Sequence, residues 1–226
     1  MPVFQLTESI IFPPPELARS DGLLAVGGDL SEARLLLAYE QGIFPWYSPG
    51  EPILWWAPSP RLVLEPKKFR ISKKLAGEIR KGTFKVTMDL AFSDVITECA
   101  DIRVERDEGT WITNEMKNAY VRLHELGYAH SVECWQEGKL AGGLYGVSLG
   151  TVFFGESMFS RVSNSSKVAL ATLARILTEW KFDMIDCQIT TSHLMGLGAQ
   201  QINGREFYTR LQKYTKLPTR RGKWRL

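Results

Sequence analysis

Five prolines between Phe44 and Arg61 constrain the fold of this chain more than any other feature. They occupy positions 45, 49, 52, 58 and 60 of the segment FPWYSPGEPILWWAPSPR. Because proline fixes its backbone angle and has no amide hydrogen, the segment excludes a helix and limits any strand to a few residues. We place a domain boundary directly after it. This gives a small N-terminal domain over residues 1–62 and a larger domain over residues 63–226.

The N-terminal domain contains a loop-like segment, Gly22 to Leu30, followed by a helical pattern. Ser31 is a suitable N-cap for that helix and Gly42 a suitable end. We expect a small α/β domain.

The rest of the chain alternates between helical and strand patterns. One helix is predicted from Ser72 to Gly82, with Ile71, Leu75 and Ile79 on one stripe, and another from Thr113 to Gly127. Further helices are expected around Phe92–Cys99 and over 165–180 and 205–214, and strands over 83–89, 130–135, 140–150, 151–159 and 182–188. This order predicts an α+β domain around a mixed sheet, and it resembles the acyl-CoA N-acyltransferase (GNAT-like) fold.

Composition narrows the protein class. With 44% hydrophobic residues among 226, the chain can bury a core, which excludes intrinsic disorder. Cys99, Cys134 and Cys187 form no CxxC pair, and the three histidines have no metal-ligand spacing, so neither a disulfide scaffold nor a zinc site is expected. No stretch approaches the roughly 18 apolar residues of a membrane span, and the N-terminus lacks a signal-peptide pattern. We expect a cytoplasmic protein without a membrane partner.

The net charge of +3 is small, but basic residues gather in two places. One stretch lies between Lys67 and Lys81, and the other runs from Arg210 to Arg225 as a basic tail without an acid. Such patches suit contacts with phosphates. The alternative explanation, which charge alone favours, is a solvated helix face and a solubilising tail.

Tryptophans mark two candidate binding segments. The proline-rich segment holds Trp46, Trp55 and Trp56, and Trp111 stands just before the helix predicted at Thr113. Indole rings held in a rigid loop can stack on a base or line an apolar pocket. Alternatively, the three loop tryptophans seal the two domains together, and Trp111 is a hydrophobic staple for its helix.

Polar side chains also interrupt two apolar strands. Glu156 stands within FFGESMFS, and Asp186 and Gln188 end FDMIDCQ. A carboxylate in apolar surroundings needs a cation or hydrogen-bond donors. Glu156 therefore either serves a site by holding an ammonium or guanidinium group, or forms a structural ion pair with the nearby Arg161.

Six segments of the sequence together resemble those of a known protein family. GLLAVGGDL, YEQGIFPWYSPGEPILWWAPSPR, EGTWIT, LHELGYAHSVE, FFGESMFSRVSNSSKVAL and DCQ resemble, in order and spacing, the leucyl/phenylalanyl-tRNA–protein transferases. The resemblance covers about residues 4 to 210. It implies transfer of leucine or phenylalanine, and less readily methionine, from aminoacyl-tRNA to proteins that begin with arginine or lysine. The product is a substrate of N-end-rule degradation, and no metal or cofactor is used. The sequence does not determine the oligomeric state, for which we favour a monomer.

The resemblance also implies roles for particular residues. Asp186, Gln188 and Glu156 fall on catalytic positions. The 3′-terminal adenosine and the donor side chain would be held by Trp46, Trp111, Leu144, Phe153, Gly155, Met158 and Leu170. From the residues themselves, we expect the basic helix to contact the tRNA backbone through Lys73, Lys74, Arg80 and Lys81.

We expect Asp186 to orient Gln188, and Gln188 to contact the attacking amine. The resemblance implies that Gln188, assisted by Asp186, is the base. Alternatively, Gln188 only positions the amine, whose proton passes to Asp186, to water or to the substrate's ribose hydroxyl. Two other functions compete: an acetyl-CoA-dependent N-acetyltransferase, although the segment RVSNSSK lacks the glycines of a pyrophosphate loop, and a non-catalytic RNA-binding module. The transferase hypothesis requires Trp111, Glu156 and Gln188 to face a common cavity.

Overall fold

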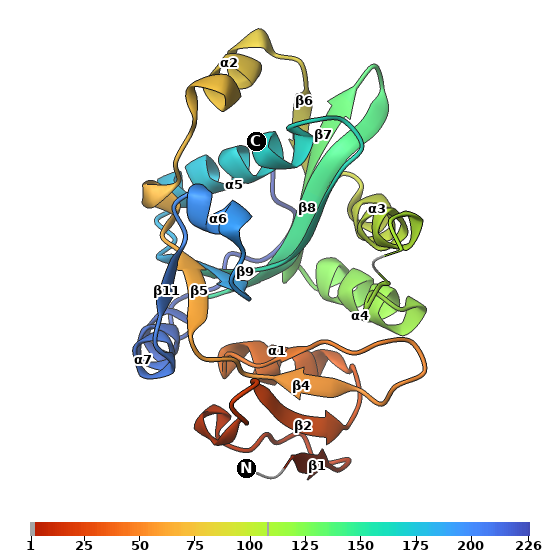
Figure 1. The fold of residues 1–226 in the computed structure, drawn as a ribbon, viewed down its shortest axis with the longest axis vertical. Helices are drawn as coiled ribbons and strands as arrows, with labels where there is room; N and C mark the ends of the chain where they lie inside the picture. Colours follow the sequence, from red (N-terminus) through yellow and green to blue (C-terminus); the bar gives the residue numbers. More distant parts are fainter. Residues whose placement is uncertain (1–2, 108) are drawn as a thin grey trace.

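The computed structural model describes residues 3–107 and 109–226, which form two sheets (Figure 1). The smaller sheet lies at the N-terminal end and has the order β1-β2-β4-β3. Its strands are β1 (Phe4–Leu6), β2 (Leu23–Gly27), β3 (Phe44–Pro45) and β4 (Leu54–Trp56), and α1 (Glu32–Glu40) follows β2. The prediction of a loop over Gly22 to Leu30 is wrong, because β2 pairs with both β1 and β4. The prolines limit β3 and β4 to two and three residues.

The larger sheet has seven strands in the order β11-β5-β10-β9-β8-β7-β6. Its strands are β5 (Arg61–Leu64), β6 (Lys85–Met88), β7 (Ala129–Gln136), β8 (Lys139–Leu149), β9 (Val152–Ser160), β10 (Met184–Gln188) and β11 (Gln200–Ile202). β9 and β10 pair in parallel, whereas the other five neighbouring pairs run antiparallel. This arrangement confirms the predicted mixed sheet and the α+β class. β11 was not expected from the sequence.

Helices cover both faces of the larger sheet (Figure 1). One face carries α3 (Phe92–Glu105) and α4 (Asn114–Glu125), and the other carries α5 (Ser165–Glu179). The remaining helices are α2 (Lys73–Lys81), α6 (Ser192–Gly196), α7 (Gly204–Tyr214) and the short 3₁₀ turns η1 (Pro15–Leu17) and η2 (Pro66–Lys68). Two hydrophobic clusters result, one on each face. None of the helices described here is long and apolar enough to cross a membrane.

The basic helix α2 begins and ends as predicted, but its apolar stripe is not buried. Ser72 accepts a hydrogen bond from the Leu75 amide, and Gly82 ends the helix in the left-handed conformation. Leu75 is buried, whereas Ile71 and Ile79 are 52% and 41% exposed. The reason is that α2 projects from the end of the molecule opposite the N-terminal sheet, so little of it meets the body (Figure 1).

The predicted boundary at residue 62 falls inside β5, which belongs to the larger sheet. The two sheets separate between Trp56 and Arg61. A single hydrophobic cluster nevertheless joins residues of both parts, including Tyr39 and Trp55 on one side and Val63 and Tyr120 on the other. The division into two domains therefore stays a prediction.

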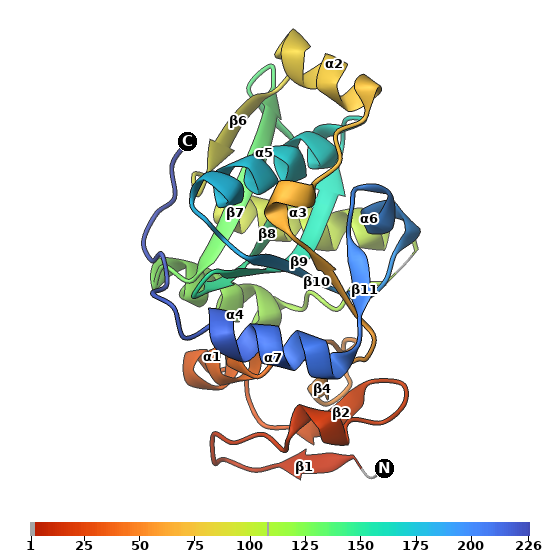
Figure 2. The same cartoon turned by 90° about the vertical axis from the view of Figure 1, so that its left-hand side faces the viewer.

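The C-terminal strap, residues 217–226, follows α7 and runs along the larger sheet to end near α5 and β6 (Figure 2). It was expected as a basic tail, and two of its four basic residues lie over aromatic rings. Arg220 lies over the Trp180 ring and Arg221 over the Tyr128 ring. Trp224 is buried, with 2% exposure. Trp224 thus anchors the strap to the fold, whereas the four basic side chains of the strap are exposed to solvent.

Candidate active site

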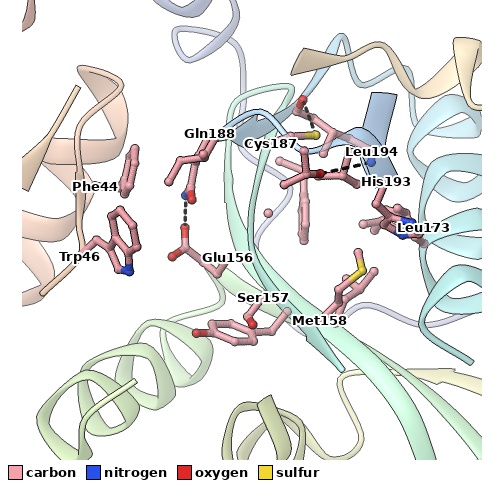
Figure 3. Close-up of a pocket in the computed structure, with 18 of the residues that line it drawn as sticks. Phe44, Trp46, Glu156, Ser157, Met158, Leu173, Cys187, Gln188, His193 and Leu194 are labelled. Carbon is pink, nitrogen blue, oxygen red and sulfur yellow. Dashed lines mark hydrogen bonds between the residues drawn. The ribbon is translucent and has the colours of Figure 1, made fainter. Parts of the chain in front are cut away.

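A cavity of about 470 Å³ opens where β9 and β10, the parallel pair, meet the N-terminal part of the chain. Figure 3 shows Phe44 and Trp46 on one side, with Glu156 and Gln188 facing them, and Leu173 and His193 on the other side. Side chains from β3, β8, β9, β10, α3, α5 and α6 contribute to its wall. Residues far apart in the sequence are therefore brought to one site.

Most of the residues predicted from the sequence line this cavity. They are Trp46, Trp111, Leu144, Phe153, Gly155, Glu156, Met158, Leu170 and Gln188. Trp111, Glu156 and Gln188 thus share a cavity, as the transferase hypothesis requires. Asp186 lies behind the wall and does not line it, and neither do the basic residues of α2, which are Lys73, Lys74, Arg80 and Lys81. Glu108, the first residue of the EGTWIT segment, lies outside the described residues.

One part of the cavity is an apolar slot on the α5 side of the sheet. Its wall consists of Leu144 from β8, Phe153 and Met158 from β9, Leu170 and Leu173 from α5, and Ile185 from β10. These residues belong to a single hydrophobic cluster. A slot of this chemistry selects an apolar side chain by its size and shape.

The aromatic wall differs in part from the sequence-based expectation. The Trp46 ring meets the Trp111 ring edge to face at 6.1 Å, and Trp56 packs against Trp46 at 5.6 Å. Trp56 also donates from its indole nitrogen to the Trp46 carbonyl at 2.6 Å. Trp55, in contrast, is fully buried, and its indole nitrogen donates to the Gly27 carbonyl. Adjacent residues of a strand point to opposite faces, so Trp55 belongs to the core and the wall consists of Trp46 and Trp111.

Arg103 of α3 adds a positive charge to this wall. Its guanidinium lies 4.1 Å from the centre of the Trp111 ring and also lines the cavity. Sequence reasoning did not single it out. A cation held over an indole in the wall of a cavity suits a phosphate or another anion.

Glu156 is the acid of the cavity, and its partners are polar side chains. Tyr120 donates to Oε2 at 3.1 Å, and Gln188 donates from Nε2 to Oε1 at 2.8 Å. The Tyr120 hydroxyl also shares a short hydrogen bond with the Tyr39 hydroxyl of α1. Burial raises the pKa of Glu156 to about 7, while the tyrosine and glutamine hydrogen bonds oppose that rise.

The alternative role for Glu156, an ion pair with Arg161, is wrong. Arg161 instead pairs with Glu98 at 2.6 Å and with Glu105. The Glu156 carboxyl therefore has no cationic partner among the described residues and relies on neutral donors.

Gln188 has an unusual backbone. Its φ of +59° lies in the left-handed region, and the pairing of β10 with β5 is irregular between Asp186 and Gln188. The Gln188 amide donates to Asp186 Oδ1 at 2.9 Å, which stabilises this conformation. Non-glycine residues held in this region often mark functional sites. Here the bend turns the Gln188 side chain toward Glu156 (Figure 3).

Asp186 is held by a buried arginine that sequence reasoning missed. Arg61 of β5 donates from Nε and Nη2 to the two carboxylate oxygens at 2.9 and 2.7 Å, and both side chains are buried. The rings of Phe44 and Phe207 flank the guanidinium. The sequence could have indicated this ion pair, because an arginine at the start of the apolar strand RLVL carries a charge that needs a partner. Tyr39 and Tyr120 gave no such signal, since buried tyrosines are common in cores.

Two further titratable residues, Cys187 and His193, line the cavity. Cys187 lines the cavity, but burial raises the pKa of its thiol, so the reactive thiolate is disfavoured. His193 of α6 lines the cavity as well, and burial lowers its pKa. The imidazole is therefore neutral near pH 7.

Comparison with known proteins identifies relatives over the whole chain. The chain is 58% identical over 226 residues to a leucyl/phenylalanyl-tRNA–protein transferase of Desulfatibacillum aliphaticivorans, with 100% of this chain and 97% of the relative covered. It is 61% identical to one of Syntrophobacter fumaroxidans, covering 93% and 90%. A solved aminoglycoside acetyltransferase from a soil metagenome is a remote likeness, with 15% identity, a TM-score of 0.40 and coverage of 59% and 88%.

Family models match both parts of the chain. Residues 28–59 match the model described as the leucyl/phenylalanyl-tRNA protein transferase N-terminal domain, and residues 63–212 match the model described as leucyl/phenylalanyl-tRNA protein transferase. These matches favour an enzyme over a non-catalytic RNA-binding module, and an aminoacyl-tRNA over acetyl-CoA as donor. Together with the cavity of indoles, apolar side chains and Glu156, they show that the chain belongs to the leucyl/phenylalanyl-tRNA–protein transferase family.

Proposed function

We propose that this chain transfers leucine or phenylalanine, and methionine less well, from aminoacyl-tRNA to the α-amino group of proteins that begin with arginine or lysine. The modified proteins would enter N-end-rule degradation, and the enzyme would act as a cytoplasmic monomer. The observation that carries the proposal is the single cavity in which an apolar slot, two indoles and the Glu156–Gln188 pair meet.

The slot and the indoles suit the two parts of the donor end. A leucine or phenylalanine side chain matches the apolar wall around Phe153, Met158 and Leu170. The adjacent Trp46 and Trp111 offer ring faces for the terminal adenine, worth about 1–3 kcal/mol per stacked base. Arg103, fixed over Trp111, is suited to the phosphate that precedes this nucleoside.

The reaction needs little chemical assistance, because the aminoacyl ester is already activated. A neutral amine attacks the ester carbonyl, the new C–N bond forms, and the bond from the carbonyl carbon to the ribose oxygen breaks. The amine loses a proton and the ribose oxygen gains one. Holding the two reactants in a reactive geometry can account for about 7–11 kcal/mol of barrier reduction.

Gln188 and Glu156 are suited to guide the amine. Because the Gln188 amide nitrogen donates to Glu156, its oxygen remains to accept a hydrogen bond from the attacking amine. Glu156, with a pKa of about 7, can accept a proton near neutral pH. Asp186 is occupied by Arg61 and by the Gln188 amide, so we assign it the role of holding Gln188 in place.

The basic helix α2 is our candidate for the tRNA backbone. Lys73, Lys74, Arg80 and Lys81 are exposed on a helix that projects from the body (Figure 2). Lys81 also pairs with Glu78 at 3.2 Å, an exposed ion pair of little strength that a phosphate can replace. Phosphate contacts of this kind orient an RNA without reading its sequence.

The central experiment is a transfer assay with radiolabelled leucyl-, phenylalanyl- and methionyl-tRNA, each tested in turn. The acceptors are a protein that begins with arginine, the same protein acetylated at its N-terminus, and one that begins with glycine. We expect label on the first acceptor alone, with methionine the slowest donor. Absence of transfer from every donor, or equal labelling of the acetylated protein, would refute the proposal.

The role of α2 is tested separately by salt titration of tRNA binding. Replacing Lys73 and Lys74 with alanine should reduce the slope of log affinity against log salt by about 0.7–0.9 for each phosphate that the helix no longer neutralises. The matched control replaces Lys213 and Lys216, which are exposed basic residues outside α2. Equal slope changes in the two pairs would contradict a specific role for the helix.

A further inference from the structure

The C-terminal strap is fastened to the body at several points. Thr219 Oγ1 accepts a hydrogen bond from the Gly150 amide at 2.8 Å, and the Trp224 amide donates to Asp89 at 2.7 Å. Gly127 leaves room for the strap, because a Cβ there would overlap the Gly222 nitrogen. The strap, residues 217–226, lies beyond residue 212, where the match to the catalytic family model ends.

Trp224 is the anchor of the strap. Its ring stacks on His130 at 3.7 Å, and the rings of Trp180 and Phe182 meet it edge to face at 5.0 and 5.9 Å. Asp89 accepts from the His130 ring at 2.8 Å as well as from the Trp224 amide. One buried carboxylate thus fixes both members of the stacked pair.

Trp224 also contacts the apolar slot from behind. The Phe153 ring lies 5.9 Å from the Trp224 ring, and Phe153 lines the cavity whereas Trp224 does not. Gly146 confines the Phe153 ring from another direction. The two residues are so close that a side chain at position 146 would place its Cβ 2.6 Å from the ring. The ring that forms the slot wall is therefore held between Gly146 and the strap.

We infer that Trp224 is a positioning residue for donor selection: the strap fixes the Phe153 ring and thereby sets the size of the slot. The inference rests on the proposed function, because the slot is taken as the donor side-chain site. Removing the Trp224 ring would let Phe153 move away from the cavity. The slot would then accept phenylalanine more readily relative to leucine.

The test compares kcat/KM for phenylalanyl-tRNA and leucyl-tRNA in the full-length protein. Trp224→Ala is expected to raise the phenylalanine-to-leucine ratio by about threefold or more, a modest part of the 10–200-fold that one methylene can contribute to discrimination. Trp224→Phe keeps a ring behind Phe153 and should return the ratio close to the wild-type value. Should Trp224→Ala not fold, Trp224→Leu provides the same comparison.

Leu211→Ala is the matched control. Leu211 is a buried residue of α7 in the other hydrophobic cluster, and it does not line the cavity. The Leu211→Ala substitution should lower stability without changing the surroundings of Phe153. The variant's phenylalanine-to-leucine ratio of kcat/KM should therefore equal that of the wild type. An unchanged ratio in folded Trp224→Ala, or the same change in Leu211→Ala, would overturn the inference. A wild-type protein that transfers neither amino acid would instead refute the proposed function.

Discussion

Replacing Glu156 with glutamine removes the charge of the cavity acid while keeping its size and one accepting oxygen. In the folded protein the pKa of Glu156 rises from the ordinary 4.5 to about 7, because burial disfavours the carboxylate. The unfolded chain therefore releases this proton at a lower pH than the folded chain. The stability that the protonated group contributes is complete below pH 4.5 and is lost as the pH rises to about 7.

The size of this loss follows from the shift. A pKa that moves from 4.5 to about 7 corresponds to about 3 kcal/mol, since one unit is worth about 1.4 kcal/mol. Glu156→Gln lacks the titrating group. Relative to the wild type, the variant should gain about 3 kcal/mol in free energy of unfolding between pH 4 and pH 8. Its transfer activity should fall, because the amide cannot accept a proton.

The assay is urea denaturation of both proteins at half-unit steps from pH 4 to pH 8.5. Tyr120→Phe provides an internal test, because it removes one of the donors that hold the carboxylate. This variant should move the pH-dependent step upward. If the stability difference between wild type and Glu156→Gln stays constant over the whole range, the carboxyl is not perturbed and our assignment of its role fails.

Three further predictions concern neighbouring residues. Asp186→Asn leaves the buried Arg61 guanidinium without its anionic partner, and urea denaturation should show a loss of about 3–5 kcal/mol; a loss below 1 kcal/mol would contradict the buried ion pair. Trp46→Leu should raise the KM for aminoacyl-tRNA by about 5- to 150-fold with little change in kcat, the equivalent of about 1–3 kcal/mol of stacking; a fall in kcat alone would argue against stacking. Arg103→Met should slow transfer from aminoacyl-tRNA by about 10- to 100-fold, the worth of a charge-assisted hydrogen bond, yet spare an aminoacyl-adenosine without phosphates. Equal losses with both donors would exclude a phosphate contact.

Local patterns were enough to predict much of this protein. Ser72 and Thr113 cap their helices as expected, because a hydroxyl that accepts the third amide is a local arrangement. The strands around Glu156 and Asp186 appear where apolar runs predicted them. The segment Gly22 to Leu30 was misjudged, because three glycines among nine residues suggest a loop and only pairing with β1 and β4 makes part of it a strand.

Contacts between distant segments also limited what could be predicted about the cavity. The sequence singled out Glu156, Gln188 and Trp111 by residue type and by resemblance, and the folded chain brings them to one cavity. Sequence patterns could not pair Arg61 with Asp186, which are 125 residues apart. They also could not link Tyr39 to Tyr120 across 81 residues. Only the resemblance to the family separated Trp46, at the cavity, from Trp55, in the core, because residue type and local pattern are the same for both.

The order of residues was sufficient for most element types, the helix caps, the family and most of the candidate side chains, because these depend on neighbouring residues or on long matching strings. Folding in three dimensions settled which partner each buried charge has, how far Glu156 is removed from water, and that the C-terminal strap packs behind Phe153. These properties depend on distances between segments that are remote along the chain. Burial and pairing energies arise only when such segments meet.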